Sequence, residues 1–174
     1  MLRTLASASA LALAAAASSF AGEGDFTVGA GYSHVDLDGA SVGAITLRGG
    51  YEFTNYLGVE GQVDIGIADD TVTVLATPID VELNYAASLF GVARAPLAPN
   101  FNLLARIGYT TAEVEASVPG FSLSDDADGF AYGVGAEFFV DDHNGFRFDY
   151  TRHDFDGGDG DVFGLHYVRR FGGR

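Results

Sequence analysis

The sequence lacks cysteine and lysine altogether, and it has only four prolines among 174 residues. Without cysteine, the chain can form neither a disulfide frame nor a thiolate metal site, so stability must come from burial, backbone pairing or lipid. Basic residues are scarce as well: beyond the N-terminal segment, eight arginines face 24 acidic residues, which gives a formal charge of −16. Such acidity argues against nucleic acid as a partner, because nucleic-acid binding depends on cationic contacts to phosphate.

Apolar runs long enough to cross a bilayer as a helix are also missing. The alanine- and leucine-rich stretch at residues 5–17 is too short, at about thirteen residues, to span the hydrocarbon core. Arg3 precedes this stretch and Ser19-Phe20-Ala21 follows it as a small-x-small cleavage site. We therefore predict a signal peptide over residues 1–21, and one β-barrel domain over residues 22–174. A buried N-terminal helix is the alternative, but no later segment has helical periodicity.

What the sequence does contain is alternation, and the clearest case is residues 57–67. Apolar side chains occupy one phase and glycine, glutamate, glutamine and aspartate occupy the other. Because successive side chains of a strand point to opposite faces, this pattern predicts a strand with one apolar and one polar face. Its length of about eleven residues also matches a tilted strand that crosses a membrane.

The same alternation recurs in seven further segments, at about residues 25–35, 42–53, 79–95, 101–113, 129–140, 145–153 and 161–171. Connections at 54–56, 96–100 and 141–144 are short, whereas those at 36–41, 68–78, 114–128 and 154–160 are mostly longer and acidic. In an up-and-down meander these two sets lie at opposite ends, which is typical of outer-membrane proteins. We therefore predict an all-β fold, an eight-stranded antiparallel up-and-down transmembrane β-barrel, closed because unpaired backbone groups are costly in hydrocarbon.

The aromatic residues indicate which face is outside. A soluble ligand-binding barrel would turn its apolar phase inward, and alternation alone does not exclude it. However, the aromatics of the apolar phase lie near the strand ends with aliphatic residues between them, as in the girdles where lipid meets water. We expect these girdles to comprise Tyr32, Tyr51, Phe53, Tyr85, Phe101, Tyr109, Tyr132, Phe138, Phe146, Phe163, Tyr167 and Phe171.

The polar phase would then line a narrow lumen, and it carries charges of both signs. An unpaired guanidinium in such an interior is costly, so we expect arginines and carboxylates to pair and to plug the half nearer the short turns. The alternative is an ion path lined by opposite charges. The predicted network consists of Arg48, Glu52, Glu60, Asp64, Glu82, Arg94, Arg106, Glu137, Arg147 and Asp149.

Catalytic and metal sites are not indicated by any spaced motif. Ser33 and His34 are neighbours on a strand and so point to opposite faces, which prevents joint catalysis. An acidic loop, with Asp154, Asp156, Asp159 and Asp161, is a candidate for weak Ca²⁺ or Mg²⁺ binding, but it lacks EF-hand spacing and a closing glutamate. We expect its aspartates to keep a glycine-rich turn solvated, and we predict no catalytic residue and no cofactor.

Three stretches, GYEFTNYLGVEGQVDIG, GFAYGVGAEFFVDDHNGFRFDY and VFGLHYVRRF, resemble the small outer-membrane β-barrel family of OmpA transmembrane domains, OmpX and related porin-like surface proteins. The closing stretch departs from the family's C-terminal pattern by continuing as Gly172-Gly173-Arg174 beyond Phe171. The resemblance implies a Gram-negative outer membrane, periplasmic termini, folding by the barrel-assembly machinery, and lipid and lipopolysaccharide as surroundings. We expect a monomeric, non-enzymatic protein of envelope structure or surface interaction; the alternatives are a narrow channel, a lipid A-modifying enzyme or a soluble barrel.

Overall fold

The computed structural model describes the backbone of residues 24–37, 40–68, 70–74, 77–118, 121–155 and 158–172, and the side chains of residues 24–36, 41–67, 84–113, 127–155 and 158–172. The predicted signal peptide lies outside the described residues. The elements in chain order are β1 (Asp25–Leu37), β2 (Ala40–Glu52), β3 (Leu57–Ala68), β4 (Asp70–Val74), β5 (Thr77–Ala98), β6 (Phe101–Val118), β7 (Phe121–Phe139), β8 (Asn144–Phe155) and β9 (Gly158–Phe171). Among these described residues, no helix is long and apolar enough to cross a membrane.

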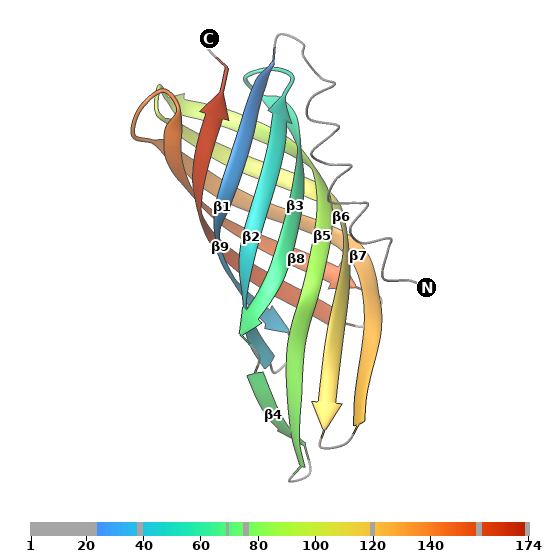
Figure 1. Cartoon of the computed structure of the whole chain (residues 1–174). Helices are drawn as coiled ribbons and strands as arrows, with labels where there is room; N and C mark the ends of the chain where they lie inside the picture. Colours follow the sequence, from blue (N-terminus) through green and yellow to red (C-terminus); the bar gives the residue numbers. More distant parts are fainter. Residues whose placement is uncertain are drawn as a thin grey trace.

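The strands form one closed antiparallel barrel (Figure 1). Each strand except β3 pairs with the next along the chain, β1 pairs with β9, and β3 pairs with β5 instead of β4. Strands β3 and β4 both pair with β5, through Ile65 opposite Tyr85 and Asp70 opposite Val81, so they are two parts of one barrel strand with a one-residue irregularity. The barrel therefore has eight strands in up-and-down order, which confirms the predicted fold class.

The strands are strongly tilted, as the register shows when it is followed once around the barrel. Starting at Phe26, the successive partners are Tyr51, Val59, Gly91, Ile107, Tyr132, Arg152, Asp161 and Asp36. The path returns to β1 ten residues beyond its start. A stagger of this kind accompanies a strand tilt of roughly 35–45°, and eight strands leave an interior just wide enough for side chains to fill.

The short connections lie at one end of the barrel, here called the short-turn end. At the turn before β3, the N–H groups of Tyr56 and Leu57 donate to Thr54 Oγ1 at 3.1 and 3.0 Å. At the turn before β8, Asp141 Oδ1 accepts the N–H groups of His143 and Asn144 at 2.8 and 2.5 Å. The first strand also begins, and the last ends, at this end of the barrel, shown uppermost in Figure 1.

The opposite end, here called the loop end, differs from the sequence prediction. Most of the predicted loop at 114–128 is strand, because residues 114–118 pair with 121–125 across β6 and β7. The predicted loop at 68–78 contains β4 and the start of β5, and much of 154–160 belongs to β8 and β9. The acidic composition favoured loops, but a hairpin that extends beyond the rest of the barrel needs only its own ladder of hydrogen bonds, which a polar sequence can also form.

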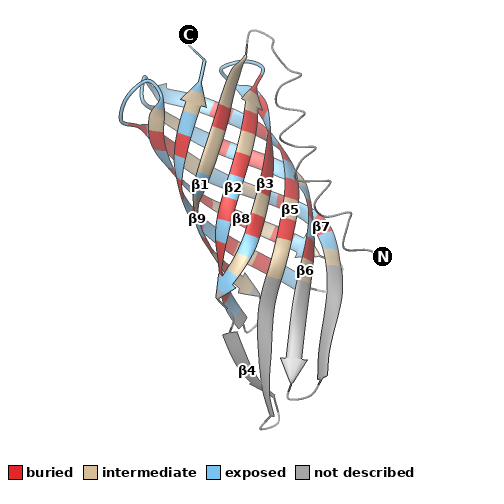
Figure 2. Ribbon diagram, in the orientation of Figure 1, coloured by how far each residue is buried: buried red, intermediate tan, exposed pale blue. Residues whose placement is uncertain are grey.

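Figure 2 shows buried and exposed residues alternating along the strands. The exposed phase is the apolar one and the buried phase is the polar one, so the apolar side chains face outward and the polar side chains line the interior. Leu89 and Ile107 are 64% and 65% exposed, whereas Glu60 and Arg106 on the other phase of neighbouring strands are 3% and 4% exposed. The alternation of buried and exposed residues along β8 and β9 shows the same division. The orientation is that of a barrel with an apolar exterior, and it is the reverse of a soluble ligand-binding barrel.

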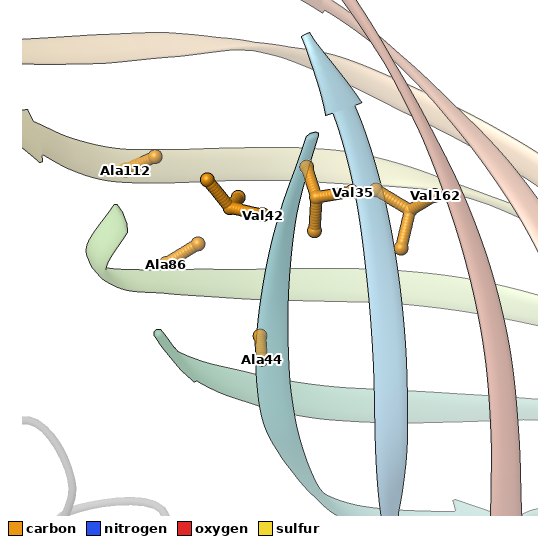
Figure 3. Packing of buried hydrophobic residues seen from close by; sticks show 6 residues of the cluster. All are labelled: Val35, Val42, Ala44, Ala86, Ala112 and Val162. Atoms are coloured by element: carbon orange, nitrogen blue, oxygen red, sulfur yellow. The ribbon is translucent and has the colours of Figure 1, made fainter. Parts of the chain in front are cut away.

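Two apolar clusters fill parts of the interior. One lies toward the loop end and is made of small side chains from β1, β2, β5, β6 and β9, namely Val35, Val42, Ala44, Ala86, Ala112 and Val162 (Figure 3). Phe155 packs against this cluster. The other comprises Phe90, Val92, Leu104 and Ala131 on β5, β6 and β7. The second cluster lies level with charged side chains, because Leu104 is the register partner of Arg94 and Val92 that of Arg106.

Candidate functional site: the charged lumen

Three arginines converge on two carboxylates inside the barrel. Asp149 on β8 pairs with Arg48 Nη1 of β2 at 2.7 Å, with Arg106 Nη2 of β6 at 2.7 Å and with Arg147 Nε at 3.1 Å. Glu60 on β3 pairs with Arg147 Nη1 at 2.6 Å and with Arg106 Nη1 at 3.1 Å. The side chains of this group are 4% exposed or less, so strands from opposite walls of the barrel are joined by desolvated, charge-assisted hydrogen bonds.

A second group continues the network toward the short-turn end. Arg94 on β5 lies 3.5 Å from Glu52 on β2 and 3.7 Å from Glu137 on β7. Glu137 in turn lies 3.5 Å from Arg147 Nη1, which connects this group to the central one. The result is a continuous set of ion pairs across the lumen, built from β2, β3, β5, β6, β7 and β8.

Neutral side chains that the sequence analysis did not include complete the arginine contacts. Gln62 Oε1 accepts hydrogen bonds from Arg48 Nε at 3.0 Å and from Arg106 Nη1 at 2.9 Å. Thr151 Oγ1 accepts Arg106 Nε at 3.0 Å. The ring of Phe90 lies 4.5 Å from the guanidinium carbon of Arg106, close enough for a cation–π contact. The only sequence signal for these residues was their inward phase, which they share with the charges.

Two residues of the predicted network are placed differently from the rest. Within the described part of the chain, Asp64 forms no ion pair with an arginine; it accepts hydrogen bonds from Thr46 Oγ1 at 2.5 Å and from Gln62 Nε2 at 2.7 Å. The side chain of Glu82 lies outside the described residues. The backbone of Glu82 pairs with Glu115, in the part of the hairpin at the loop end.

The histidines divide between the two faces. His34 is half-buried and lies 3.4 Å from Asp36, while its neighbour Ser33 is fully buried on the opposite face, as the strand geometry requires. The structure instead brings Ser33 to His166, with Oγ 3.4 Å from Nε2, and His166 Nδ1 lies 3.4 Å from Asp149 Oδ2. These are the residue types of a hydrolytic triad. However, the three side chains are at most 1% exposed, so no substrate bond can reach the hydroxyl.

The acidic segment proposed for metal binding is partly neutralised by an arginine. Arg152 donates to Asp161 through Nη1 at 3.1 Å and pairs with Asp159 through Nη2, and Tyr150 Oη donates to Asp161 at 2.6 Å. These contacts lower the pKa of the Asp161 carboxyl, with the Tyr150 hydrogen bond as the main cause. Asp156 lies outside the described residues, and the described part of the chain has no group of three acidic or histidine side chains able to hold a metal ion.

The predicted girdle residues lie on the outer face in two sets. Toward the short turns, Phe101, Phe138, Phe146 and Tyr167 are successive register partners on β6 to β9. The other members of this set are Tyr51, Phe53 and Phe171, with Phe53 and Phe171 exposed and Tyr51 half-buried. Toward the loop end lie Tyr32, Tyr85, Tyr109, Tyr132 and Phe163, and Tyr109 also meets Phe130 edge-on at 5.5 Å. Two levels of aromatic side chains with aliphatic residues between them are typical of a surface that crosses two lipid–water interfaces.

Comparison with known proteins gives a consistent picture. The family model described as outer membrane protein beta-barrel domain matches residues 4–171. No protein with a curated description matches the sequence. The solved structure of OprG from Pseudomonas aeruginosa is 16% identical with a TM-score of 0.64, over 86% of this chain and 97% of that one.

Two further structures have the same fold. Ail, the attachment invasion locus protein of Yersinia pestis, solved with the heparin analogue sucrose octasulfate, is 22% identical with a TM-score of 0.63, over 86% of this chain and 100% of that one. Neisserial surface protein A is 10% identical with a TM-score of 0.59, over 86% of this chain and 96% of that one. At these identities the likeness concerns the fold alone.

Proposed function

Because the chain belongs to the family of outer membrane protein beta-barrel domains, we propose that it is a non-enzymatic outer-membrane protein whose lumen is closed by ion pairs. Its role in this proposal is envelope structure or interaction at the cell surface through the hairpins of the loop end. Outer-membrane lipid and lipopolysaccharide are the proposed partners, the protein is a monomer, and both termini face the periplasm. Residues 1–21 serve as the signal peptide that exports it.

The observation that carries the proposal is the network around Glu60 and Asp149. Guanidinium groups from three strands contact these two carboxylates at 2.6–3.1 Å, and every member is almost fully buried. An ion that crossed the barrel would have to separate these pairs, and breaking one buried pair costs about 3–5 kcal/mol. Such a barrier makes steady conduction unfavourable, so the interior supports a structural role.

A role without catalysis is supported by the contacts of Ser33, which lies in a group with His166 and Asp149. Ser33 lies 2.6 Å from Thr46 Oγ1, nearer than its 3.4 Å approach to His166. Its hydroxyl is thus held within the packed interior, and lipid on the outer face has no access to it. A lipid A-modifying enzyme would need a nucleophile at the outer surface.

The second candidate function, a narrow channel, is favoured by one feature of the short-turn end. Among the described residues, Glu52 Oε1, Arg94 Nε and Glu137 Oε2 are buried without a hydrogen-bond partner. Buried polar atoms of this kind are usually bonded to water, and water reaching them from the periplasmic side would shorten the closed part of the lumen.

Conductance across a planar bilayer distinguishes the two functions. The folded protein is expected to give no steady openings, whereas Glu60→Gln, which weakens the central network, is expected to give rare, brief ones. Steady openings of the unaltered protein that change with Glu60→Gln would establish the channel instead. Heat-modifiable gel mobility of both proteins ensures that each is folded. An unchanged lipid A mass on overexpression is the expected result for a protein without lipid-modifying activity.

A further inference from the structure

Arg169 places a positive charge on the outer face of the barrel, at the level of the short-turn girdle. It lies on β9 between Tyr167 and Phe171, two members of that girdle, and shares their exposed, outward phase. Strand β9 ends at the short-turn end, beside the C-terminal label in Figure 1. Girdle residues of a membrane-spanning barrel lie where lipid meets water, so the guanidinium of Arg169 is held at the depth of lipid headgroups.

The outward residues around Arg169 are uncharged. Its register partners are Val28 on β1 and Asn144 on β8, and its neighbours on β9 are the two girdle aromatics. Its guanidinium carbon lies 5.3 Å from the centre of the Phe171 ring, close enough for a cation–π contact. Such a contact orients the guanidinium but does not neutralise it. Among the described side chains, Arg169 forms no ion pair.

The polar groups of the adjacent turn satisfy one another instead of pairing with Arg169. Asp141 Oδ1 accepts the N–H groups of His143 and Asn144 at 2.8 and 2.5 Å, and Asp141 Oδ2 accepts the side-chain amide of Asn144 at 2.8 Å. The remaining oxygen of that amide accepts the hydroxyl of Tyr167. The N–H groups of the Arg169 side chain are therefore left for an acceptor that lies outside the described part of the chain.

Arg152, at the loop end, shows the opposite situation. It is half-buried, and its guanidinium pairs with Asp159 through Nη2 and with Asp161 through Nη1 at 3.1 Å. The other arginines with described side chains lie in the inward phase, namely Arg48, Arg94, Arg106, Arg147 and Arg170. Of the two outward arginines that the structure describes, Arg169 is thus the one without an acidic partner.

From this arrangement we propose that Arg169 binds the phosphodiester group of a phospholipid. The planar guanidinium offers two parallel N–H donors, which match two phosphate oxygens, and a phosphate supplies the negative charge that the surrounding side chains lack. The proposal rests on the membrane placement proposed above. That placement puts the short-turn end at the periplasmic leaflet, which consists of phospholipid, whereas lipopolysaccharide occupies the opposite leaflet.

Aromatic pairs on both sides of Arg169 favour a lipid over a soluble anion. Phe171 packs against Phe26 of β1 at 6.4 Å between ring centres, and Tyr167 packs against Phe146 of β8 at 6.3 Å. Apolar ring surface for acyl chains therefore flanks the cation. The chain also carries 24 acidic residues and only nine basic ones, so its overall field repels free anions. A headgroup held in place by its acyl chains overcomes that repulsion.

Native mass spectrometry of the folded protein, titrated with dimyristoylphosphatidylglycerol in detergent micelles, tests the proposal. We expect Arg169→Gln to weaken lipid binding about fivefold, as for one arginine beside an anionic lipid surface. Arg152→Gln is the matched control, because it removes the same charge from the outer face at the other end, and its lipid binding is expected to be unchanged. Equal losses in the two variants, or unchanged binding by Arg169→Gln, would overturn the proposal.

Three further ligands identify what Arg169 recognises. Dimyristoylglycerol has the same acyl chains without a phosphate, so it should bind the protein and Arg169→Gln equally. Inorganic phosphate should not displace the phospholipid. A glyceride that depends on Arg169, or displacement by phosphate alone, would contradict a phospholipid headgroup site. The proposal would also be contradicted if lipid A binding depended on Arg169 more strongly than phosphatidylglycerol binding does.

Failure of this site and failure of the membrane placement give different results. Heat-modifiable gel mobility shows that each variant is a folded barrel before titration. Recovery of the protein from the periplasm without detergent would refute the membrane placement and the lipid site together. Unchanged lipid affinity of Arg169→Gln, in a protein that requires detergent, would refute the lipid site alone.

Discussion

Arg147 Nη1 lies 2.6 Å from Glu60 Oε2, which joins β8 to β3 across the interior although the residues are 87 positions apart. Glu60 also forms an ion pair with Arg106, so one carboxylate partly neutralises two guanidinium groups. Glu60→Gln keeps the shape of this side chain but leaves the arginines undercompensated. We expect it to lower the free energy of unfolding by about 3–5 kcal/mol, measured by urea unfolding in lipid vesicles.

Glu113→Gln is the control for Glu60→Gln. Glu113 is half-buried near the loop end and accepts a hydrogen bond from Asn84 Nδ2 at 3.0 Å, an interaction that glutamine can retain. The expected change is below about 1 kcal/mol, as for partly exposed polar pairs. Equal effects of the two substitutions would mean that the central network does not stabilise the fold.

Glycine in the inward phase makes room for large side chains, and this can be tested at Gly164. Alanine there would place its Cβ 2.2 Å from His166 Cε1, so the ring has to move. We expect Gly164→Ala to destabilise the barrel by about 1–3 kcal/mol, the usual cost of overpacking. Gly91→Ala is the control, because its Cβ would point outward and meet only Ile107 O at 3.8 Å. If Gly91→Ala costs as much in the same urea titration, crowding at His166 is not the cause.

Period-two alternation was sufficient to predict the strands and their faces. Leu57 to Ile67 alternates without a polar residue in the apolar phase, so its orientation followed from counting alone. In the acidic hairpins the alternation was outweighed by composition: Val114, Ala116 and Val118 alternate with Glu115 and Ser117 and pair as regular strand, yet the acidic residues around them favoured a loop. The strand ends at the loop end were therefore underestimated.

Partners across the lumen could not be predicted from the sequence. Phase alone places Arg106 and Asp149 inside, but their 2.7 Å contact depends on the stagger of the whole barrel. The approach of Ser33 to His166 likewise depends on the β1–β9 register, which joins the two ends of the chain. A local pattern does not tell how far along the barrel axis each side chain lies. The sequence therefore predicts which residues belong to the network, and the strand register determines which of them pair.

The turn between β7 and β8 should give the barrel a pH-dependent stability. Asp141 accepts the side-chain amide of Asn144, which is the main cause of its lowered pKa, and the N–H groups of His143 and Asn144 lower the pKa further. Since the pKa is lowered in the folded protein, the stabilisation is full above the ordinary value of about 3.9 and is lost as pH falls through the folded value. We expect Asp141→Asn to destabilise the barrel at neutral pH more than at acidic pH, in urea titrations at both.

Asp142→Asn, the next position of the same turn, controls for a general effect of charge. It removes the same unit of negative charge from the same surface, so any difference between the two variants reports the hydrogen bonds of Asp141. An equal pH dependence of both variants would assign the effect to net charge and refute the role of the turn.

Because the apolar phase faces outward, an arginine placed in it should destabilise the barrel by an amount that depends on its depth in the bilayer. Val134 is 59% exposed on β7 and lies between the girdle residues Tyr132 and Phe138, whereas Val140 is 60% exposed but lies in the following turn. Arginine at the midplane of a bilayer costs about 2–4 kcal/mol, and close to the interface about 0–1 kcal/mol. Refolding into lipid vesicles should therefore show Val134→Arg destabilised by the larger amount and Val140→Arg nearly unaffected. In water both positions would accept arginine equally, so equal stabilities in vesicles would mean that lipid does not surround β7.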